Sequence, residues 1–491
     1  MNTKNCFFVL FLWLAPWTGL HASDTPAQKP NIVFLIADDL ATRLGYYGDQ
    51  AAITPNLDRL AAEGILFNHA YAQGSVCIPS RTSFMLGLNN RHAGADHFKQ
   101  HPETMTLGRW FREHGYQTFS VGKIDHDETY TDPKAWDIRV PIKDCKRAAA
   151  PRHALESADE DQGRKRRTGL RFHVEDDVEA LDDHARTERA LQFLTHQRDP
   201  KRPFFAAVGF HSPHDPWEAT RAMHDALDPS RFTLQWPSPA NVSPLPPRAL
   251  FDDPGFDMSP GRQRELQRLY YATVTLLDHE VGRILDQLRS QGLLENTVIV
   301  FTSDQGFHLG WRGQWHKHTL SEEVLRVPLI VRLPQGPRGA KAGGIVELLD
   351  LFPTFCDLAG LPVPEKLDGK SFQPLLKDPK AEGKPGAFCS MPPGWGNGRT
   401  VRTLRWRLTE RLDGSRELYD LHHDPLEYYN VLNQPENAPL AKRLHAMLEQ
   451  EFGPMAMTVP ACRQSPETAA KSPSRADNFR ALKPLEESAG R

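Results

Sequence analysis

The most informative segment for the fold class is Asn31-Ile-Val-Phe-Leu-Ile-Ala37, which is followed directly by Asp38-Asp39. This continuous apolar run is bounded by Pro30 and by the two aspartates, which is typical of a strand buried on both faces of a parallel sheet. Thr297-Val-Ile-Val-Phe-Thr-Ser303 has the same form and ends in Asp304-Gln305-Gly306. The two runs predict two buried strands, each followed by an acidic residue.

Helical patterns lie between these two runs, at residues 56–64 and 264–292, and further apolar runs occur at 204–210 and 327–333. Strands that alternate with helices predict an α/β fold in which helices cover both faces of a sheet.

The C-terminal part of the chain has a different pattern. Shorter alternating runs, such as residues 400–408, precede an amphipathic segment at 438–452. They predict a small antiparallel sheet with one helix. The polar residues 461–491 are predicted to form a disordered tail.

In open α/β sheets, ligands bind beyond the carboxyl ends of the strands. Asp38, Asp39 and Asp304 are therefore expected to share one site. Carboxylates that lie close together repel one another, and a bound cation usually neutralises them. Gln305 adds an amide oxygen as a further ligand. Oxygen ligands favour Ca²⁺ or Mg²⁺ over zinc. The alternative is that each aspartate only caps the helix after its strand.

The composition excludes several classes of protein. The 491 residues include 59 Lys plus Arg and 62 Asp plus Glu, for a formal net charge of −3. Nucleic-acid binders usually carry a basic excess, so no nucleic-acid partner is expected. The 39% hydrophobic and 25% charged fractions argue against global disorder. The 40 Pro and 34 Gly exclude a coiled coil.

Residues 1–22 have the pattern of a secretory signal peptide: Lys4, then an apolar run from Cys6 to Leu20, then the small residue Ala22. The run is shorter than the roughly 20 residues that cross a bilayer. The alternative is a short anchor that is not cleaved. The mature protein is expected to be periplasmic or secreted, without a membrane anchor.

Removal of the signal leaves an odd number of cysteines, so that one thiol cannot pair within the chain. The motif below singles out Cys77 as the odd one. Three disulfide pairings are open to the remaining cysteines, which are Cys145, Cys356, Cys389 and Cys462.

Cys77-Ile-Pro79-Ser80-Arg81, with Leu86-Gly87 after it, resembles the signature of the type I, formylglycine-dependent sulfatase family. The resemblance extends through nearly the whole mature chain, from the first strand and helix to Leu418-Tyr-Asp-Leu-His-His-Asp-Pro-Leu-Glu427. Within the family the chain looks most similar to the iduronate-2-sulfatase-like group. The segments that carry this likeness are Gly122-Lys-Ile-Asp-His126, Phe210-His-Ser-Pro-His-Asp-Pro216 and Trp315-His-Lys317.

The resemblance implies an alkaline-phosphatase-like sandwich with a large, mixed and mainly parallel sheet between helices. It also implies that a separate formylglycine-generating maturation enzyme oxidises Cys77 to 3-oxoalanine, an aldehyde. The hydrated aldehyde has two hydroxyls on one carbon. One can attack sulfur, and deprotonation of the other expels sulfate and restores the aldehyde.

Roles for the site residues follow from the same resemblance. One Ca²⁺ ion is expected to be bound by Asp38, Asp39, Asp304, Gln305 and the modified Cys77. Family members commonly carry Asn or His where Gln305 stands, and Gln is one methylene longer. The other catalytic residues are expected to be Arg81 beside the hydrate, Lys123 and Lys317 on the sulfate oxygens, His126 as the acceptor of the proton whose loss releases sulfate, and His214 at the leaving oxygen.

Some assignments stay open between binding and packing. His211 and His318 either bind substrate or pack beside the site. Three tryptophans close to the site residues could either stack on sugar rings or pack in the core, and the sequence favours neither role: Trp217, Trp311 and Trp315. The charged segment 143–189 is expected to be a solvated surface insertion, with a basic rim that recruits a polysulfated chain as the alternative.

The sequence thus predicts a sulfatase acting on a sulfated carbohydrate, such as a glycosaminoglycan or an algal-type polysaccharide fragment. The alternatives are a phosphodiesterase or phosphonate monoester hydrolase of the same superfamily, and a non-catalytic lectin-like glycan binder. The expected divisions are a signal peptide at 1–22, a catalytic domain at 23–380, a smaller α+β subdomain at 381–460 and the tail.

Overall fold

The computed structural model describes residues 29–93, 103–126, 132–145, 156–157, 170–234, 242–246, 258–391 and 398–455. The predicted signal peptide, the basic run 164–167, Cys462 and the predicted tail lie outside the described residues. The domain boundaries stay predictions.

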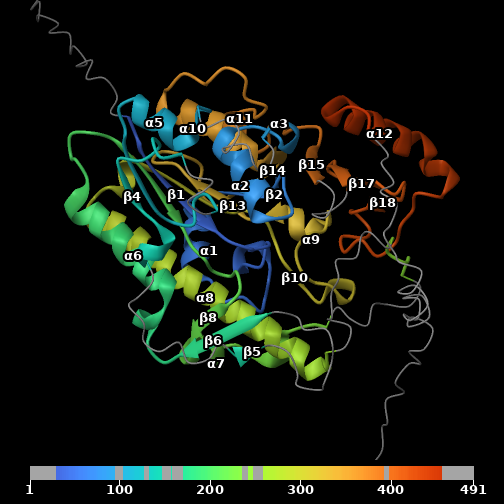
Figure 1. Ribbon diagram of the computed structural model, residues 1–491, viewed down its shortest axis with the longest axis horizontal. Helices are drawn as coiled ribbons and strands as arrows, with labels where there is room; N and C mark the ends of the chain where they lie inside the picture. Colours follow the sequence, from blue (N-terminus) through green and yellow to red (C-terminus); the bar gives the residue numbers. More distant parts are fainter. Residues whose placement is uncertain are drawn as a thin grey trace, which may run out of the picture.

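A nine-stranded sheet forms the centre of the described part, in the order β12-β2-β13-β9-β1-β7-β3-β4, with β14 paired to β2 (Figure 1). Its strands are β1 (Asn31–Ala37), β2 (Ile65–Tyr71), β3 (Gln117–Gly122), β4 (Ile138–Val140), β7 (Phe204–Gly209), β9 (Thr297–Ser303), β12 (Arg326–Val327), β13 (Leu329–Arg332) and β14 (Ala340–Glu347). The predicted buried strands 31–37 and 297–303 are confirmed residue for residue as β1 and β9.

The neighbours β9, β1, β7, β3 and β4 run parallel, whereas β13 is antiparallel to both β9 and β2. The apolar run predicted at 327–333 is divided into β12 and β13 at Pro328, because proline has no N–H for a sheet ladder. The sheet is therefore mixed and mainly parallel, as predicted.

Alternate side chains of β1 point into two separate cores. Val33 and Leu35 pack with one face's helices, whereas Ile32 and Phe34 pack with those of the other face. The first face is covered by α1 (Pro55–Ala62), α6 (Asp182–Gln192) and α8 (Pro260–Ser290), and the second by α2 (Cys77–Leu86), α5 (Leu107–Glu113), α10 (Leu351–Ala359) and α11 (Gln373–Lys377). Figure 1 shows the resulting sandwich, which confirms the predicted fold class.

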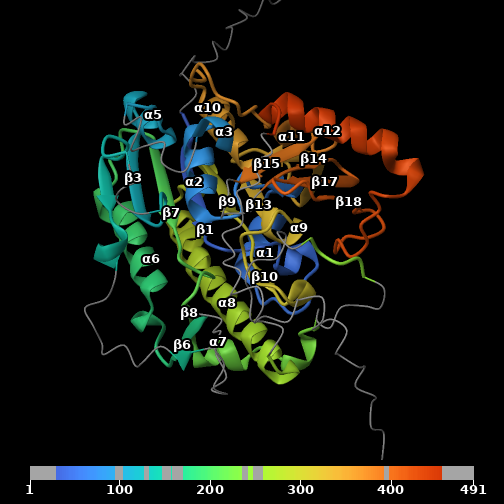
Figure 2. The ribbon, with the colours of Figure 1, turned by 45° about the vertical axis from the view of Figure 1, so that its right-hand side comes forward.

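A small antiparallel sheet lies beside the sandwich (Figure 2). Its strands are β15 (Ala387–Met391), β16 (Gly398–Arg402), β17 (Trp406–Arg411) and β18 (Arg416–Asp420). Helix α12 (Ala438–Phe452) packs Leu444 and Leu448 against Val401 and Leu408. The predicted C-terminal sheet and its helix are confirmed.

Shorter elements connect and flank these layers. They are α3 (Asn90–Ala93), β5 (Glu156–Ser157), β6 (Arg171–Glu175), β8 (Trp217–Thr220), α7 (Arg221–Asp225), β10 (His308–Leu309), β11 (Trp315–His316) and α9 (Glu322–Leu325).

The prediction of a solvated insertion at 143–189 is wrong for its last part. Residues 182–189 lie in α6, where Asp183, Arg186 and Thr187 are buried. The prediction assumed that charged residues of this segment face solvent, but Asp183 and Arg186 form an ion pair with each other in the interior.

Two open questions about single residues are settled by burial. Trp217, Trp311 and Trp315 are core residues. Cys145, Cys356 and Cys389 are buried free thiols, so none of the pairings among these three is formed. Among the described residues, no helix combines the length and the apolar character needed to cross a membrane.

Candidate active site

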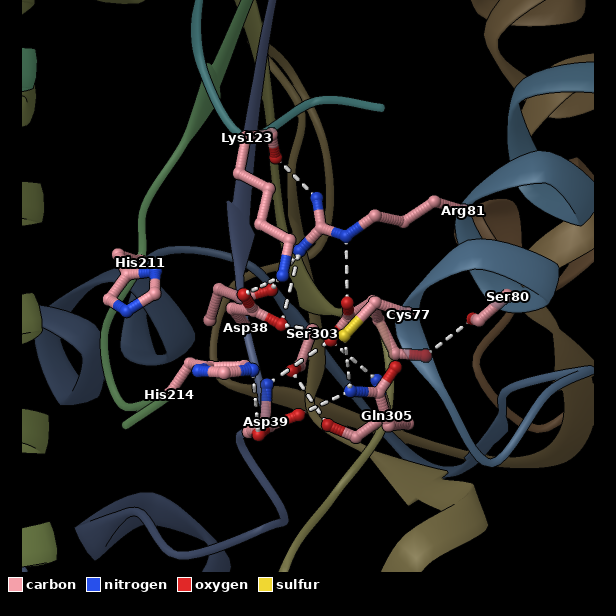
Figure 3. Close-up of polar contacts among 12 residues, drawn as sticks. Asp38, Asp39, Cys77, Ser80, Arg81, Lys123, His211, His214, Ser303 and Gln305 are labelled. Carbon is pink, nitrogen blue, oxygen red and sulfur yellow. Dashed lines mark hydrogen bonds and ion pairs between the residues drawn. The ribbon is translucent and has the colours of Figure 1, made fainter. Parts of the chain in front are cut away.

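Four neighbouring parallel strands deliver polar residues to the same edge of the sheet (Figure 3). Asp304 and Gln305 follow β9, and Asp38 and Asp39 follow β1. The turn with His211 and His214 follows β7, and Lys123 follows β3. The site therefore lies beyond the carboxyl ends of the strands, as the sequence predicts.

Cys77 is the first residue of α2 and is only 5% exposed. Its Sγ lies 3.3 Å from Asp38 Oδ1, 3.3 Å from Gln305 Nε2 and 3.1 Å from Lys317 Nζ. Burial and the Asp38 carboxylate raise the pKa of the thiol to about 12, so that the encoded side chain is a neutral thiol. A helix N-terminus favours negative charge beside it.

The three predicted carboxylates are completely buried and lie around Arg81 and two lysines. Arg81 Nε is 2.7 Å from Asp304 Oδ2, and its Nη2 is 3.7 Å from Asp38 Oδ1. Lys123 Nζ pairs with Asp38, and Lys317 Nζ lies 2.5 Å from Asp39 Oδ1. Burial alone would raise the pKa of Asp38, but Lys123, His214 and Arg81 hold it well below 3.8.

The oxygen atoms of the cluster fit a divalent cation. Gln305 Nε2 donates to Asp39 Oδ1 and to Cys77 Sγ, which leaves Gln305 Oε1 to act as a ligand. Within the part of the chain that the structure describes, Gln305 Oε1 and Asp39 Oδ2 are buried without a hydrogen-bond partner. Ligand atoms of Asp38, Asp39, Cys77 and His214 lie within 4.8 Å of one another. Buried carboxylate and amide oxygens suit a hard cation such as Ca²⁺.

His214 is held at one ring nitrogen and faces the carboxylates with the other. Its Nδ1 lies 2.5 Å from the backbone oxygen of Asp215, and its Nε2 lies 3.8 Å from Asp39 Oδ2. Because a carbonyl can only accept, Nδ1 carries the hydrogen of that bond. Burial and Lys317 lower the pKa of His214 to about 3.

The two histidines of uncertain role both lie near the site. His211 is ring to ring with His214, with centroids 4.9 Å apart, and its Nε2 is 3.1 Å from the Asp215 oxygen. His318 follows Lys317, and its backbone N–H donates to Ser75. His126 is half-buried, three residues beyond Lys123, and its role stays a prediction.

Sequence reasoning missed several residues that fix the cluster. Ser303 Oγ accepts from the Leu40 N–H and donates to the Gln305 carbonyl. Tyr270 donates its hydroxyl to the Asp39 carbonyl, 2.7 Å away. Ser303 could have been singled out by its place before Asp304, whereas nothing local marks Tyr270 within a 31-residue helix.

Comparisons with known proteins agree with this geometry. The family description "Sulfatase" matches residues 30–361, and that of the C-terminal part of N-sulphoglucosamine sulphohydrolase matches residues 310–452. Iduronate 2-sulfatase of Homo sapiens is 29% identical over 523 residues, with 84% of this chain and 93% of the relative covered. N-acetylglucosamine-6-O-sulfatase of Bacteroides thetaiotaomicron is 26% identical over 522 residues, with 86% of each chain covered.

Two solved structures share the fold at a TM-score of 0.70. One, in complex with its substrate D-glucosamine-2-N,6-O-disulfate, is 24% identical and aligns over 86% of this chain and 97% of its own. The phosphonate monoester hydrolase of Agrobacterium radiobacter is 20% identical and aligns over 86% and 95%. At these identities the solved structures support the alkaline-phosphatase-like fold alone.

The family match includes the first strand, the Cys77 motif and the strand that precedes Asp304. Because it extends over more than half of the chain, the chain belongs to the sulfatase family and is an enzyme that hydrolyses sulfate esters.

Proposed function

We propose that this enzyme is a calcium- and formylglycine-dependent sulfatase that acts on a sulfated carbohydrate. The observation that carries the proposal is the position of Cys77, between the Asp38 carboxylate and the Lys317 ammonium group at the start of a buried helix. A nucleophile held there would face an anionic ester with a cation already beside it.

The residues that would hold Ca²⁺ are Asp38, Asp39, Asp304 and Gln305, together with an oxygen at position 77. The bound ion would supply positive charge that balances the converging carboxylates and the sulfate oxygens. Oxidised by a formylglycine-generating enzyme, Cys77 would supply an aldehyde hydrate, with one hydroxyl to attack sulfur and a second to release sulfate.

The remaining side chains bind the ester and move protons. Lys123 and Lys317 supply preorganised positive charge for the sulfate oxygens. A bound sulfate ester would bring negative charge beside His214 and favour its protonated ring. The Nε2–H of that ring would then donate its proton to the leaving oxygen, while the bond from Nδ1 to Asp215 fixes the ring. His126 would accept the proton of the second hydroxyl of the hydrate, and the loss of this proton releases sulfate. His211 and His318 would bind the substrate.

The carbohydrate substrate is supported by the relatives. Iduronate 2-sulfatase, N-acetylglucosamine-6-O-sulfatase and an ulvan-active sulfatase of Formosa agariphila are all named for sulfated sugars. The predicted signal peptide supports a periplasmic or secreted enzyme.

Mass spectrometry of the tryptic peptide that contains Cys77 tests the modification. Conversion of the thiol to the aldehyde is expected to remove about 18 Da, since the –CH2–SH group becomes –CHO, with loss of sulfur and two hydrogens and gain of one oxygen. Cys145→Ser, which alters another buried free thiol, is expected to keep activity, whereas Cys77→Ser is expected to lose it. Equal hydrolysis by both variants would indicate a glycan binder with a hydrolytic background.

A rate comparison on an aryl sulfate, an aryl phosphate and an aryl phosphonate monoester tests the reaction. Sulfate hydrolysis is expected to be fastest. Faster phosphonate or phosphate turnover would assign the chain to the phosphoryl-transferring branch of the superfamily, whose fold is equally similar.

A further inference from the structure

A buried ion pair on α6 lies directly behind the turn that carries His214. Asp183 is 2% exposed and accepts two consecutive backbone hydrogen bonds, from His211 N at 2.9 Å and from Ser212 N at 2.8 Å. Each carboxylate oxygen takes one of these bonds. The carboxylate therefore fixes the backbone position of the turn two residues before His214.

Arg186 holds Asp183 in this place. It is 2% exposed, pairs with Asp183 Oδ1 and has Asp182 Oδ2 at 3.9 Å. Its side chain also packs against the end of β3, where a Cβ at Gly122 would lie 2.9 Å from Arg186 Cδ. With its cation confined between α6 and β3, the carboxylate of Asp183 has little freedom to move away from the turn.

The other side of the same turn is attached to the end of β1, which carries Asp38 and Asp39. The Ser212 carbonyl accepts from Asp38 N at 3.2 Å, and His214 N donates to the His211 carbonyl at 2.8 Å. The turn is thus anchored by α6 on one side and by β1 on the other. The position of His214 depends on these backbone bonds, because the hydrogen bond of its ring is made to the Asp215 carbonyl within the same turn.

We propose that Asp183, held by Arg186, is a positioning residue for the sulfatase reaction: it sets the His214 ring at the leaving oxygen without touching the substrate. This inference rests on the proposed function and adds to it a residue outside the family motif and outside the site. It predicts a loss that depends on the leaving group. A poor leaving group, such as a sugar alkoxide, needs a proton from His214, whereas 4-nitrophenolate leaves without one.

Asp183→Asn tests the proposal, because the amide keeps the shape but can accept at only one of its two atoms. We expect its kcat on a sugar sulfate to fall by about tenfold or more, and its kcat on 4-nitrophenyl sulfate to change by less than about threefold, since a general acid contributes roughly 10²–10⁴-fold. In a His214→Ala background, Asp183→Asn is expected to add no further loss on the sugar sulfate.

Asp278→Asn is the matched control. Asp278 is also a 2%-exposed helical aspartate that accepts two consecutive backbone N–H bonds, from Asn56 and Leu57 at the start of α1. It is expected to change stability without changing the ratio of the two rates. If Asp183→Asn does not fold, Asp183→Glu, which keeps the charge opposite Arg186, is tested in its place. The same fall in the ratio of kcat on the sugar sulfate to kcat on 4-nitrophenyl sulfate is expected.

The outcomes separate the two proposals. An unchanged ratio in the Asp183 variant, or the same ratio change in Asp278→Asn, overturns the positioning role while leaving the sulfatase intact. Wild-type enzyme without activity on either ester overturns the proposed function, and the positioning role with it.

Discussion

Arg81 is the residue on which the charge balance of the site depends. It lies 1% exposed among the carboxylates and also donates to the backbone carbonyls of Lys123, Ile124 and Ala37. Its planar group of five donors can satisfy two carboxylates and three carbonyls at once, which a lysine cannot do.

Arg81→Met is expected to lower the free energy of unfolding by about 3–5 kcal/mol, because it leaves the buried carboxylate of Asp304 without its ion-pair partner. Denaturant titration measures this change. Arg59→Met, which breaks the exposed pair with Asp286, is the control and is expected to cost less than about 1 kcal/mol. Equal losses in the two variants would show that Arg81 does not neutralise the cluster.

Among the helices and strands, the ends of β3 and β7 lie so close to each other that Gly122 and Gly209 have no room for a side chain. A Cβ at Gly209 would lie 2.1 Å from the Lys123 carbonyl, and one at Gly122 would lie 2.1 Å from the Gly209 carbonyl. Gly122 also has φ +76°, in the left-handed region. This close approach places Lys123 beside the carboxylates.

Gly209→Ala is expected to reduce sulfatase activity by more than about tenfold, because separating the strand ends displaces Lys123 from the sulfate. Steady-state kinetics and thermal unfolding measure the two effects. Gly343→Ala is the control, since a Cβ there meets no atom within 4 Å and should leave activity unchanged. Full activity in Gly209→Ala would contradict the placement of Lys123.

At the scale of the whole molecule, the site joins segments that are distant in the chain. Lys317 pairs with Asp39 across 278 positions, and Gln305 bonds to Asp39 across 266. A bound divalent ion would therefore connect the two strands of the sheet that carry the carboxylates.

Ca²⁺ is expected to stabilise the entire fold. At 100 times its dissociation constant, the ion should add about 2.7 kcal/mol to the free energy of unfolding, and a chelator should remove this increment. Thermal unfolding with and without Ca²⁺ measures it. Gln305→Ala should reduce the increment, whereas Gln117→Ala, at the amino end of β3, should not. No response to Ca²⁺ in the wild type would count against the metal site.

Glu322 joins the catalytic sandwich to the C-terminal sheet. It lies 3.0 Å from Arg402 Nε and 2.5 Å from Arg407 Nη2, and accepts from the Tyr71 hydroxyl. Burial alone would raise the pKa of Glu322, but Arg402 and Arg407 hold it well below 4.5.

A depressed pKa means that Glu322 stabilises the fold above its unfolded pKa, near 4.5, and that this contribution is lost as the pH falls toward the lower folded value. Glu322→Gln should therefore cost about 3–5 kcal/mol near pH 7, and the difference from wild type should shrink below pH 4.5. Denaturant titrations at pH 7, 5 and 3.5 measure it. A difference that is constant with pH would exclude the ion pairs as its cause.

The sequence could predict the strands and helices whose apolar pattern lies in neighbouring residues. Strands β1 and β9 and helix α12 have the predicted bounds, because a strand buried on both faces leaves a continuous apolar run and a helix buried on one face leaves a periodic one. The acidic residues after β1 and β9 could be placed together because parallel strands end at one edge. The motif at Cys77 indicated the family without any structure.

The tertiary structure alone decided which distant groups meet. Asp183 and Arg186 belong to a segment that reads as a charged surface, yet they are buried behind the His214 turn. Likewise, Cys145, Cys356 and Cys389 stay unpaired, although their number allows bridges. The pairing of a buried charge or thiol is set by contacts across tens to hundreds of residues, and such contacts leave no periodicity or spacing in the sequence from which they could be predicted.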